Sequence, residues 1–107
     1  TEGTAVSINY VSGSSKRIQS MTLGRRALEP GRRVLIIDDF MKAGGTALGM
    51  INLLKEFEAD VVGVGVLMET PREKEPKLVE DYLSLLQLKE LDPVKAIVKV
   101  VAQDISL

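Results

Sequence analysis

The feature that most constrains the fold is a strand–helix–strand pattern in the middle of the chain. Residues 33–38, RVLIID, form a continuous apolar run that is typical of a strand covered on both faces. Over residues 46–57 an apolar side chain recurs every third position, which predicts one stripe of an amphipathic helix. Residues 60–69, DVVGVGVLME, predict a second buried strand. These three elements form a βαβ unit, so the chain is expected to adopt an α/β fold with a parallel sheet, flanking helices and right-handed crossovers.

The segment before this unit contains one further strand and one helix by its pattern. Residues 5–10, AVSINY, alternate apolar and polar side chains, which predicts a strand with unequal faces. Residues 12–17, SGSSKR, read as a mobile loop. We expect a helix over about residues 17–28, capped by Ser14 or Ser15 and ended by Pro30 and Gly31, with apolar contacts from Ile18, Met21 and Leu28.

The segment after the unit is less strongly patterned. Residues 70–77, TPREKEPK, indicate a charged surface connection. Residues 81–88, DYLSLLQL, predict either a third parallel strand or a short helix, because periodicity does not separate the two in so short a run. Residues 96–101, AIVKVV, predict a late strand that is a candidate for antiparallel pairing.

Composition excludes several classes of chemistry. The 107 residues contain no cysteine and no histidine, which removes disulfides, thiol nucleophiles, cysteine–zinc sites and imidazole acid–base catalysis. A net charge of −1 gives no overall attraction to nucleic acid or to an anionic membrane. No apolar run approaches the roughly 18–20 residues that cross a bilayer, so we expect no membrane partner and a cytoplasmic location. The chain starts at Thr1, and we expect it to be one domain, or part of one, cut from a longer protein.

Two adjacent carboxylates mark one end of the first strand of the unit. Asp38 and Asp39 follow the apolar run directly. In an open parallel sheet the ligand crevice lies beyond the carboxyl ends of the strands, so both acids are placed at a binding edge. Buried without a partner they would resist ionisation. Sugar hydroxyls or a hydrated Mg²⁺ are groups that would meet them.

The turn that follows offers the opposite chemistry. Lys42, Ala43, Gly44, Gly45 and Thr46 lead into the start of the helix. Backbone N–H groups are free at a helix start and the helix dipole adds positive charge, which suits a phosphate. Glycine lets an anion approach the amides, and the Thr46 hydroxyl can donate to the ligand and cap the helix. A Gly-Gly turn or an acid pair is common by itself. Their order here favours a ribose 5-phosphate, with its hydroxyls on Asp38 and Asp39 and its phosphate on residues 43–46.

The residues 34–47, VLIIDDFMKAGGTA, resemble the phosphoribosyl pyrophosphate (PRPP) binding motif of type I phosphoribosyltransferases. The stretch SINYVSGSSKRIQSMTLGRRALEPGRR is similar to the flexible-loop strand and following helix of that family. The flanking segments VSINYVSGSSKRIQSMTL and LVEDYLSLLQL look most like the regulatory branch of the family, the purine operon repressors of Gram-positive bacteria. The resemblance covers about residues 5–90.

This resemblance implies a partial type I phosphoribosyltransferase fold. Residues 1–107 would be the C-terminal part of a PRPP-sensing effector domain in a homodimeric repressor of purine biosynthesis genes. Operator DNA would be bound through an N-terminal winged-helix domain that is not in this sequence. The resemblance assigns ribose to Asp38 and Asp39 and the 5′-phosphate to Lys42, Ala43, Gly44, Gly45 and Thr46. Lys16 and Arg17 are either contacts to the diphosphate on a closing loop or a solvated basic loop. The resemblance implies neither a catalytic residue nor a dedicated metal site, although Mg²⁺ remains possible as a companion of PRPP.

Lys42 is a departure from the enzymes of the family. Many of them carry an acidic or small residue here, and in some an aspartate acts as general base toward the purine. A lysine with an ordinary pKa near about 10.4 is protonated and is a poor base. The alternative remains an active purine phosphoribosyltransferase for xanthine or adenine that uses Mg²⁺. A receiver-type signalling domain, suggested by VLIIDDF, is disfavoured because it leaves the Gly-Gly-Thr turn without a role.

Overall fold

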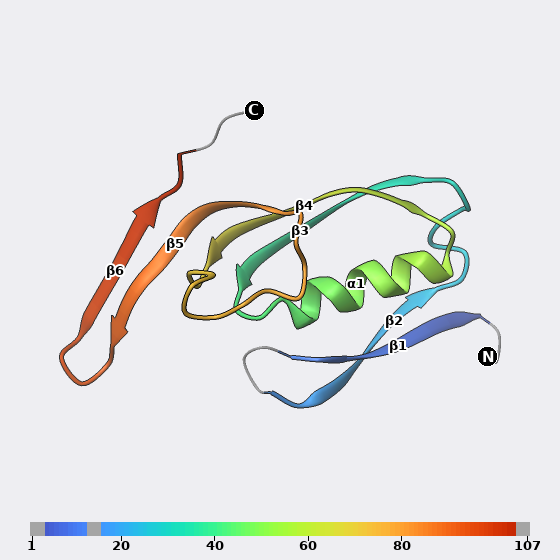
Figure 1. Ribbon diagram of the computed structural model, residues 1–107. Coiled ribbons are helices and arrows are strands. Elements are labelled where there is room, and N and C mark those ends of the chain that lie inside the picture. The colour runs from blue at the N-terminus through green and yellow to red at the C-terminus, as the bar shows by residue number, and fades with distance from the viewer. Residues whose placement is uncertain (1–3, 13–15, 105–107) are drawn as a thin grey trace.

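The structure is a computed structural model that describes residues 4–12 and 16–104. Two sheets enclose a helix in this part of the chain (Figure 1). The elements, in chain order, are β1 (Ala5–Val11), β2 (Ile18–Gly24), β3 (Arg33–Met41), α1 (Gly45–Glu56), β4 (Asp60–Glu69), β5 (Leu83–Asp92) and β6 (Ile97–Ala102). No helix among the described residues is long and apolar enough to cross a membrane.

The larger sheet has the strand order β3-β4-β5-β6. β3, β4 and β5 run parallel, and β6 is antiparallel to β5. The predicted βαβ unit is therefore confirmed as β3–α1–β4. Residues 81–88 fall mainly in the parallel strand β5 rather than in a helix, and the late strand is antiparallel.

Helix α1 packs on one face of this sheet. Ile36, Val64 and Val66 from the strands meet Ala47 and Leu54 from the helix in the buried core. Side chains alternate along a strand, so the neighbours of Ile36 lie on the opposite face. Leu35 and Ile37 are 59% and 68% exposed there. The expectation that β3 is covered on both faces is thus met on one face only within the described chain.

A separate antiparallel hairpin, β1–β2, lies on the other side of α1 (Figure 1). Its register runs from the pair Ala5 and Gly24 to the pair Val11 and Ile18. The helix predicted over residues 17–28 is therefore wrong in the structure. Its apolar spacing fits a helix, but backbone pairing with β1 makes residues 18–24 the strand β2, and residues 25–28 form a turn. The serines proposed as its cap lie outside the described residues.

Two glycines let the hairpin approach the helix. A Cβ atom on Gly45 would lie 2.0 Å from the carbonyl oxygen of Val11, and one on Gly49 would lie 2.7 Å from the Cβ atom of Tyr10. Real Cβ contacts are never so short, so only glycine fits at either position. This contact brings the end of β1 to the first turn of α1, where the acidic end of β3 also arrives.

Candidate functional site

A cavity of about 320 Å³ lies where β3 ends and α1 begins. Its lining contains both predicted carboxylates and most of residues 42–46, the turn predicted to bind a phosphate, which we call the phosphate turn. The lining residues are Ser12, Asp38, Asp39, Phe40, Met41, Lys42, Gly44, Gly45, Thr46 and Ala47. The size is at the lower end of the range of small-molecule sites.

The two carboxylates differ in their surroundings. Asp38 is half-buried, whereas Asp39 is exposed. The backbone N–H of Asp39 donates a hydrogen bond of 2.8 Å to Oδ1 of Asp38. Burial raises the pKa of Asp38 above its ordinary value, the Asp39 amide opposes this, and the neighbouring Asp39 carboxyl adds to the rise. The folded protein therefore holds a carboxylate that gains from a hydrogen-bond donor such as a sugar hydroxyl.

The turn after β3 presents unoccupied amides. Gly44 has φ +91°, a left-handed conformation that favours glycine, and α1 begins at Gly45. The N–H of Leu48 donates to the carbonyl of Gly44 at 2.9 Å, so the amides before it lie at the open start of the helix. Among the described residues, no hydrogen bond outside α1 is donated by the backbone N–H groups of residues 43–46. These amides are available to an anion.

Two details of this turn differ from the sequence interpretation. Thr46 does not cap the helix, because the cap position is Gly44, which makes no side-chain cap hydrogen bond. Gly45 lacks a Cβ for a reason other than ligand approach, since the Val11 carbonyl fills that space.

Three predicted residues do not line the cavity. The carbonyl of Ala43 faces away and accepts a hydrogen bond of 2.7 Å from the N–H of Leu78. Lys16 and Arg17 are exposed at the end of the hairpin. Among the described residues of that loop, Ser12 lines the cavity; it is 7% exposed, and its N–H donates to the Arg17 carbonyl at 3.0 Å. The signal for Ser12 in the sequence was its place directly after an alternating strand.

A second cavity of about 570 Å³ adjoins the first, and the two share Phe40 and Lys42. Its other walls come from β5 and from residues 70–79, which we call the 70–79 connection. The charged sequence of residues 70–77 predicts a surface connection. The structure instead buries Pro71 and Val79.

A buried carboxylate lies at the end of β4, beside this connection. Glu69 is 4% exposed and accepts hydrogen bonds from the Tyr82 hydroxyl at 2.5 Å and from Nε2 of Gln103 at 3.2 Å. Burial, with Glu69 as the next cause, raises the pKa of Tyr82 to about 12. The guanidinium of Arg72 lies 4.5 Å from the centre of the Tyr82 ring. These contacts tie the start of the 70–79 connection to Tyr82, just before β5, and the end of β4 to Gln103, just after β6.

Comparison with known proteins gives three informative relatives. The purine biosynthesis transcriptional repressor PurR of Bacillus subtilis (strain 168) is 61% identical over 92 residues, which is 86% of this chain and 32% of that protein. The purine biosynthesis transcriptional activator PurR of Lactococcus lactis subsp. lactis is 47% identical over 92 residues, 86% of this chain and 34% of that protein. Xanthine phosphoribosyltransferase 1 of Clostridium perfringens is 37% identical over 73 residues, 68% of this chain and 38% of the enzyme. The chain thus spans about a third of the length of the regulators that it matches.

Solved structures agree on the fold. The adenine phosphoribosyltransferase of Thermoanaerobacter pseudethanolicus superposes with a TM-score of 0.67 at 22% identity, over 81% of this chain and 51% of that one. The predicted α/β class and phosphoribosyltransferase fold are confirmed. The sequence profile of the phosphoribosyl transferase domain matches residues 3–103. The chain belongs to the phosphoribosyl transferase domain family.

Proposed function

We propose that this chain is the PRPP-sensing part of a transcriptional regulator of purine biosynthesis genes. The observation that supports it best is one cavity lined by an acid pair and by the open amides of a helix start. Ribose hydroxyls would donate to Asp38 and Asp39. The 5′-phosphate would accept from the amides of residues 44–46, beside the positive side chain of Lys42. The hydroxyl groups and the phosphate of one ligand would thus be bound by acceptors and by donors that lie a few residues apart in the chain.

The diphosphate of PRPP needs further positive charge. Mg²⁺ prefers hard oxygen ligands and retains water, so the carboxylates of Asp38 and Asp39 fit a hydrated ion that accompanies the ligand. Lys16 and Arg17 follow Ser12 on the hairpin and would supply charge if their loop closes over the cavity.

Regulation fits the site better than catalysis does. The chain has no histidine, and the residue after Met41 is a lysine, where many enzymes of the family carry an acidic or small residue. The two relatives named as regulators are 61% and 47% identical, against 37% for the xanthine enzyme. One regulator is named a repressor and the other an activator, so similarity over this part of the chain does not by itself separate repression from activation. We propose a cytoplasmic homodimeric repressor that binds operator DNA through another domain and is released by PRPP.

Calorimetry on the intact protein tests the ligand. The double variant Asp38→Asn, Asp39→Asn is expected to bind PRPP at least about tenfold more weakly, because two charged acceptors for the ribose are lost. Asp60→Asn is the matched control, since Asp60 is exposed at the opposite end of the sheet. Unchanged affinity in the double variant would exclude the ribose role. A gel shift with operator DNA, with and without PRPP, then tests release.

The enzyme remains the second candidate because of the xanthine phosphoribosyltransferase relative. The intact protein is incubated with PRPP, Mg²⁺ and xanthine or adenine, and pyrophosphate release is followed. We expect no turnover above background. Turnover at ordinary enzyme rates of about 1 s⁻¹ or more would contradict the regulator.

A further inference from the structure

The phosphate turn is held from behind by the 70–79 connection. The carbonyl of Met41 accepts a hydrogen bond of 3.0 Å from the N–H of Thr70, and that of Ala43 accepts one of 2.7 Å from the N–H of Leu78. Between them, the carbonyl of Lys42 accepts from the ammonium of Lys77. Three successive carbonyls are therefore bound by one segment.

This pattern determines where the amides of the turn point. The described peptide bonds are all trans, and in a planar trans peptide the C=O and N–H groups point in opposite directions. Because the carbonyls of Lys42 and Ala43 face the connection, the N–H groups of Ala43 and Gly44 face away from it. Gly44 lines the cavity on that side. Ala43 is not among the lining residues, so of these two amides the one placed at the cavity is that of Gly44.

The Lys77 ammonium contacts the side of this turn on which the Lys42 carbonyl lies. Its Nζ atom also donates to Oγ1 of Thr70 at 2.6 Å and reaches the carbonyl of Met41 at 3.5 Å. Thr70 donates in turn to Oε1 of Glu75 at 2.8 Å. Burial lowers the pKa of Lys77, although Glu69 and Glu75 favour its charged form. All three ammonium protons therefore have acceptors, and the charge lies directly behind the peptides that carry the amides.

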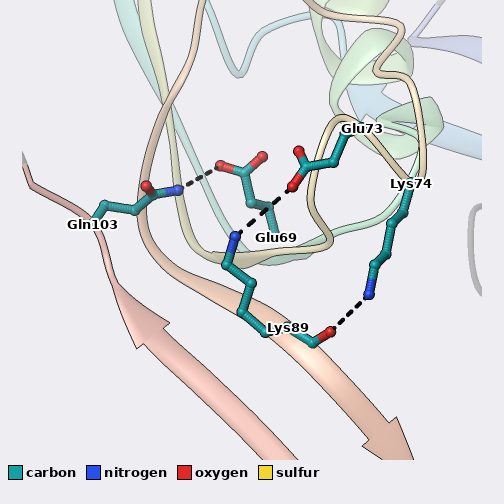
Figure 2. A network of polar contacts seen from close by, with 5 residues as sticks. All are labelled: Glu69, Glu73, Lys74, Lys89 and Gln103. Atoms are coloured by element: carbon teal, nitrogen blue, oxygen red, sulfur yellow. Dashed lines mark hydrogen bonds and ion pairs between the residues drawn. The ribbon is translucent and has the colours of Figure 1, made fainter.

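The 70–79 connection is itself held in place by buried residues near its ends and by contacts between its middle and β5. Pro71 and Val79 are buried near its two ends. Figure 2 shows the contacts that tie its middle to the sheet, in which Lys74 donates to the Lys89 carbonyl at 3.0 Å and Glu73 lies 3.8 Å from the Lys89 ammonium. The same view shows Gln103 beside Glu69, the residue that precedes Thr70.

We propose that Lys77 is a positioning residue for ligand binding: by holding the Lys42 carbonyl it orients the turn so that the Gly44 amide binds the 5′-phosphate of a sugar phosphate. A cation on a peptide carbonyl makes the N–H groups of that chain of peptides better donors. This inference rests on the proposed function, and it gives that site a supporting residue that touches no ligand.

The test measures binding of PRPP and of ribose 5-phosphate to the intact protein by calorimetry. Lys77→Met is expected to weaken both ligands by the same factor, about tenfold, because they share the 5′-phosphate. Lys77→Arg is expected to stay within about threefold of the wild type, since a guanidinium also donates to carbonyls. Lys55→Met is the matched control, an exposed lysine in the last turn of α1, some 15 Å along the helix from the turn.

The melting temperature of each variant is measured as well, and binding is compared well below it. If Lys77→Met does not fold, Lys77→Gln replaces it, because a neutral amide keeps a donor and loses the charge, and a weakening of both ligands is again expected. Wild-type affinity in the folded variant would overturn the role of Lys77 alone. A weakening that Lys77→Arg fails to rescue would also overturn it. A wild-type protein that binds neither ligand would overturn the proposed function itself.

Discussion

Asp38 is a residue at which the proposed ligand binding and the stability of the fold have opposite requirements. Its pKa is raised by burial, so the ionised form is less favourable in the folded chain than in the unfolded one. Such a group contributes its stability below the unfolded pKa of about 3.9 and loses it as the pH rises through the folded pKa. At neutral pH the charged Asp38 therefore destabilises the free protein.

Asp38→Asn is accordingly expected to raise the melting temperature at pH 7 while it weakens PRPP binding. The amide keeps an oxygen for the N–H of Asp39, so the local hydrogen bond survives. The rise is expected to be a few degrees at most, since about 1 kcal/mol corresponds to about 4–8 °C in a domain of this size. Thermal unfolding at pH 7 and at pH 3.5 measures it, and the difference should nearly vanish at the lower pH. A lower melting temperature at pH 7 would contradict this account of Asp38.

Tyr82 gives a second prediction at the level of a single residue. Because its pKa is raised to about 12, its contribution to stability is complete below about pH 10 and is lost between about pH 10 and 12. Tyr82→Phe is expected to be less stable at pH 8 by about 1–2 kcal/mol, because Oε1 of buried Glu69 loses its donor. The deficit should shrink above pH 10. Urea unfolding from pH 8 to 11 measures both effects, and a constant deficit would show that the Tyr82 hydroxyl does not titrate as described.

Among the elements, α1 depends on two glycines that face β1. Gly45→Ala is expected to cost about 2 kcal/mol or more, because the new Cβ would lie 2.0 Å from the Val11 carbonyl and the hairpin must move away. It should also weaken PRPP binding, since Ser12 would move with the hairpin. Gly24→Ala is the control, because the nearest atom to its Cβ would be 4.0 Å away and its φ is ordinary. Denaturant unfolding of both variants checks this, and equal stabilities would contradict the close packing of β1 on α1.

The elements also show what local pattern can and cannot predict. β4 was predicted at its observed bounds, and α1 and β3 within a few residues, because their buried faces impose strong periodicity. β2 was mistaken for a helix because Ile18 and Met21 fit a helical spacing. In the structure Ile18 is 75% exposed, and Met21 and Leu23 alternate inward, a pattern that only the pairing with β1 decides.

At the scale of the molecule, the candidate site residues that are close in sequence also lie together in the fold, and their roles toward a ligand stay predictions. One cavity is lined by Asp38, Asp39, Lys42, Gly44, Gly45 and Thr46. The sequence pattern alone does not point to Ser12 or Lys77, because contacts between distant segments bring each of them to the turn. Ser12 arrives with the end of β1, which packs against the start of α1, and Lys77 arrives with the 70–79 connection. A charged run such as residues 70–77 carries no local sign that one of its lysines is partly buried behind a backbone turn.

The described chain is elongated and leaves one sheet face uncovered. Its radius of gyration is 15.8 Å, whereas a compact chain of about 100 residues has about 13 Å. Leu35, Ile37, Leu67, Leu83 and Leu85 are all exposed on the sheet face opposite α1. All of them except Leu35 line one hollow on this face. Exposed apolar patches of this kind drive association in water.

Residues 1–107 expressed by themselves are therefore expected to self-associate, with a sedimentation coefficient that rises with concentration. The double variant Leu67→Lys, Leu85→Lys places two charges on this face and should remain monomeric over the same range. Val94→Lys is the control, because Val94 is 94% exposed in the turn between β5 and β6, away from the face. Analytical ultracentrifugation distinguishes the outcomes: equal association of the double variant and the wild type would show that pairing along the open edges of β3 or β6, rather than this apolar face, holds the copies together.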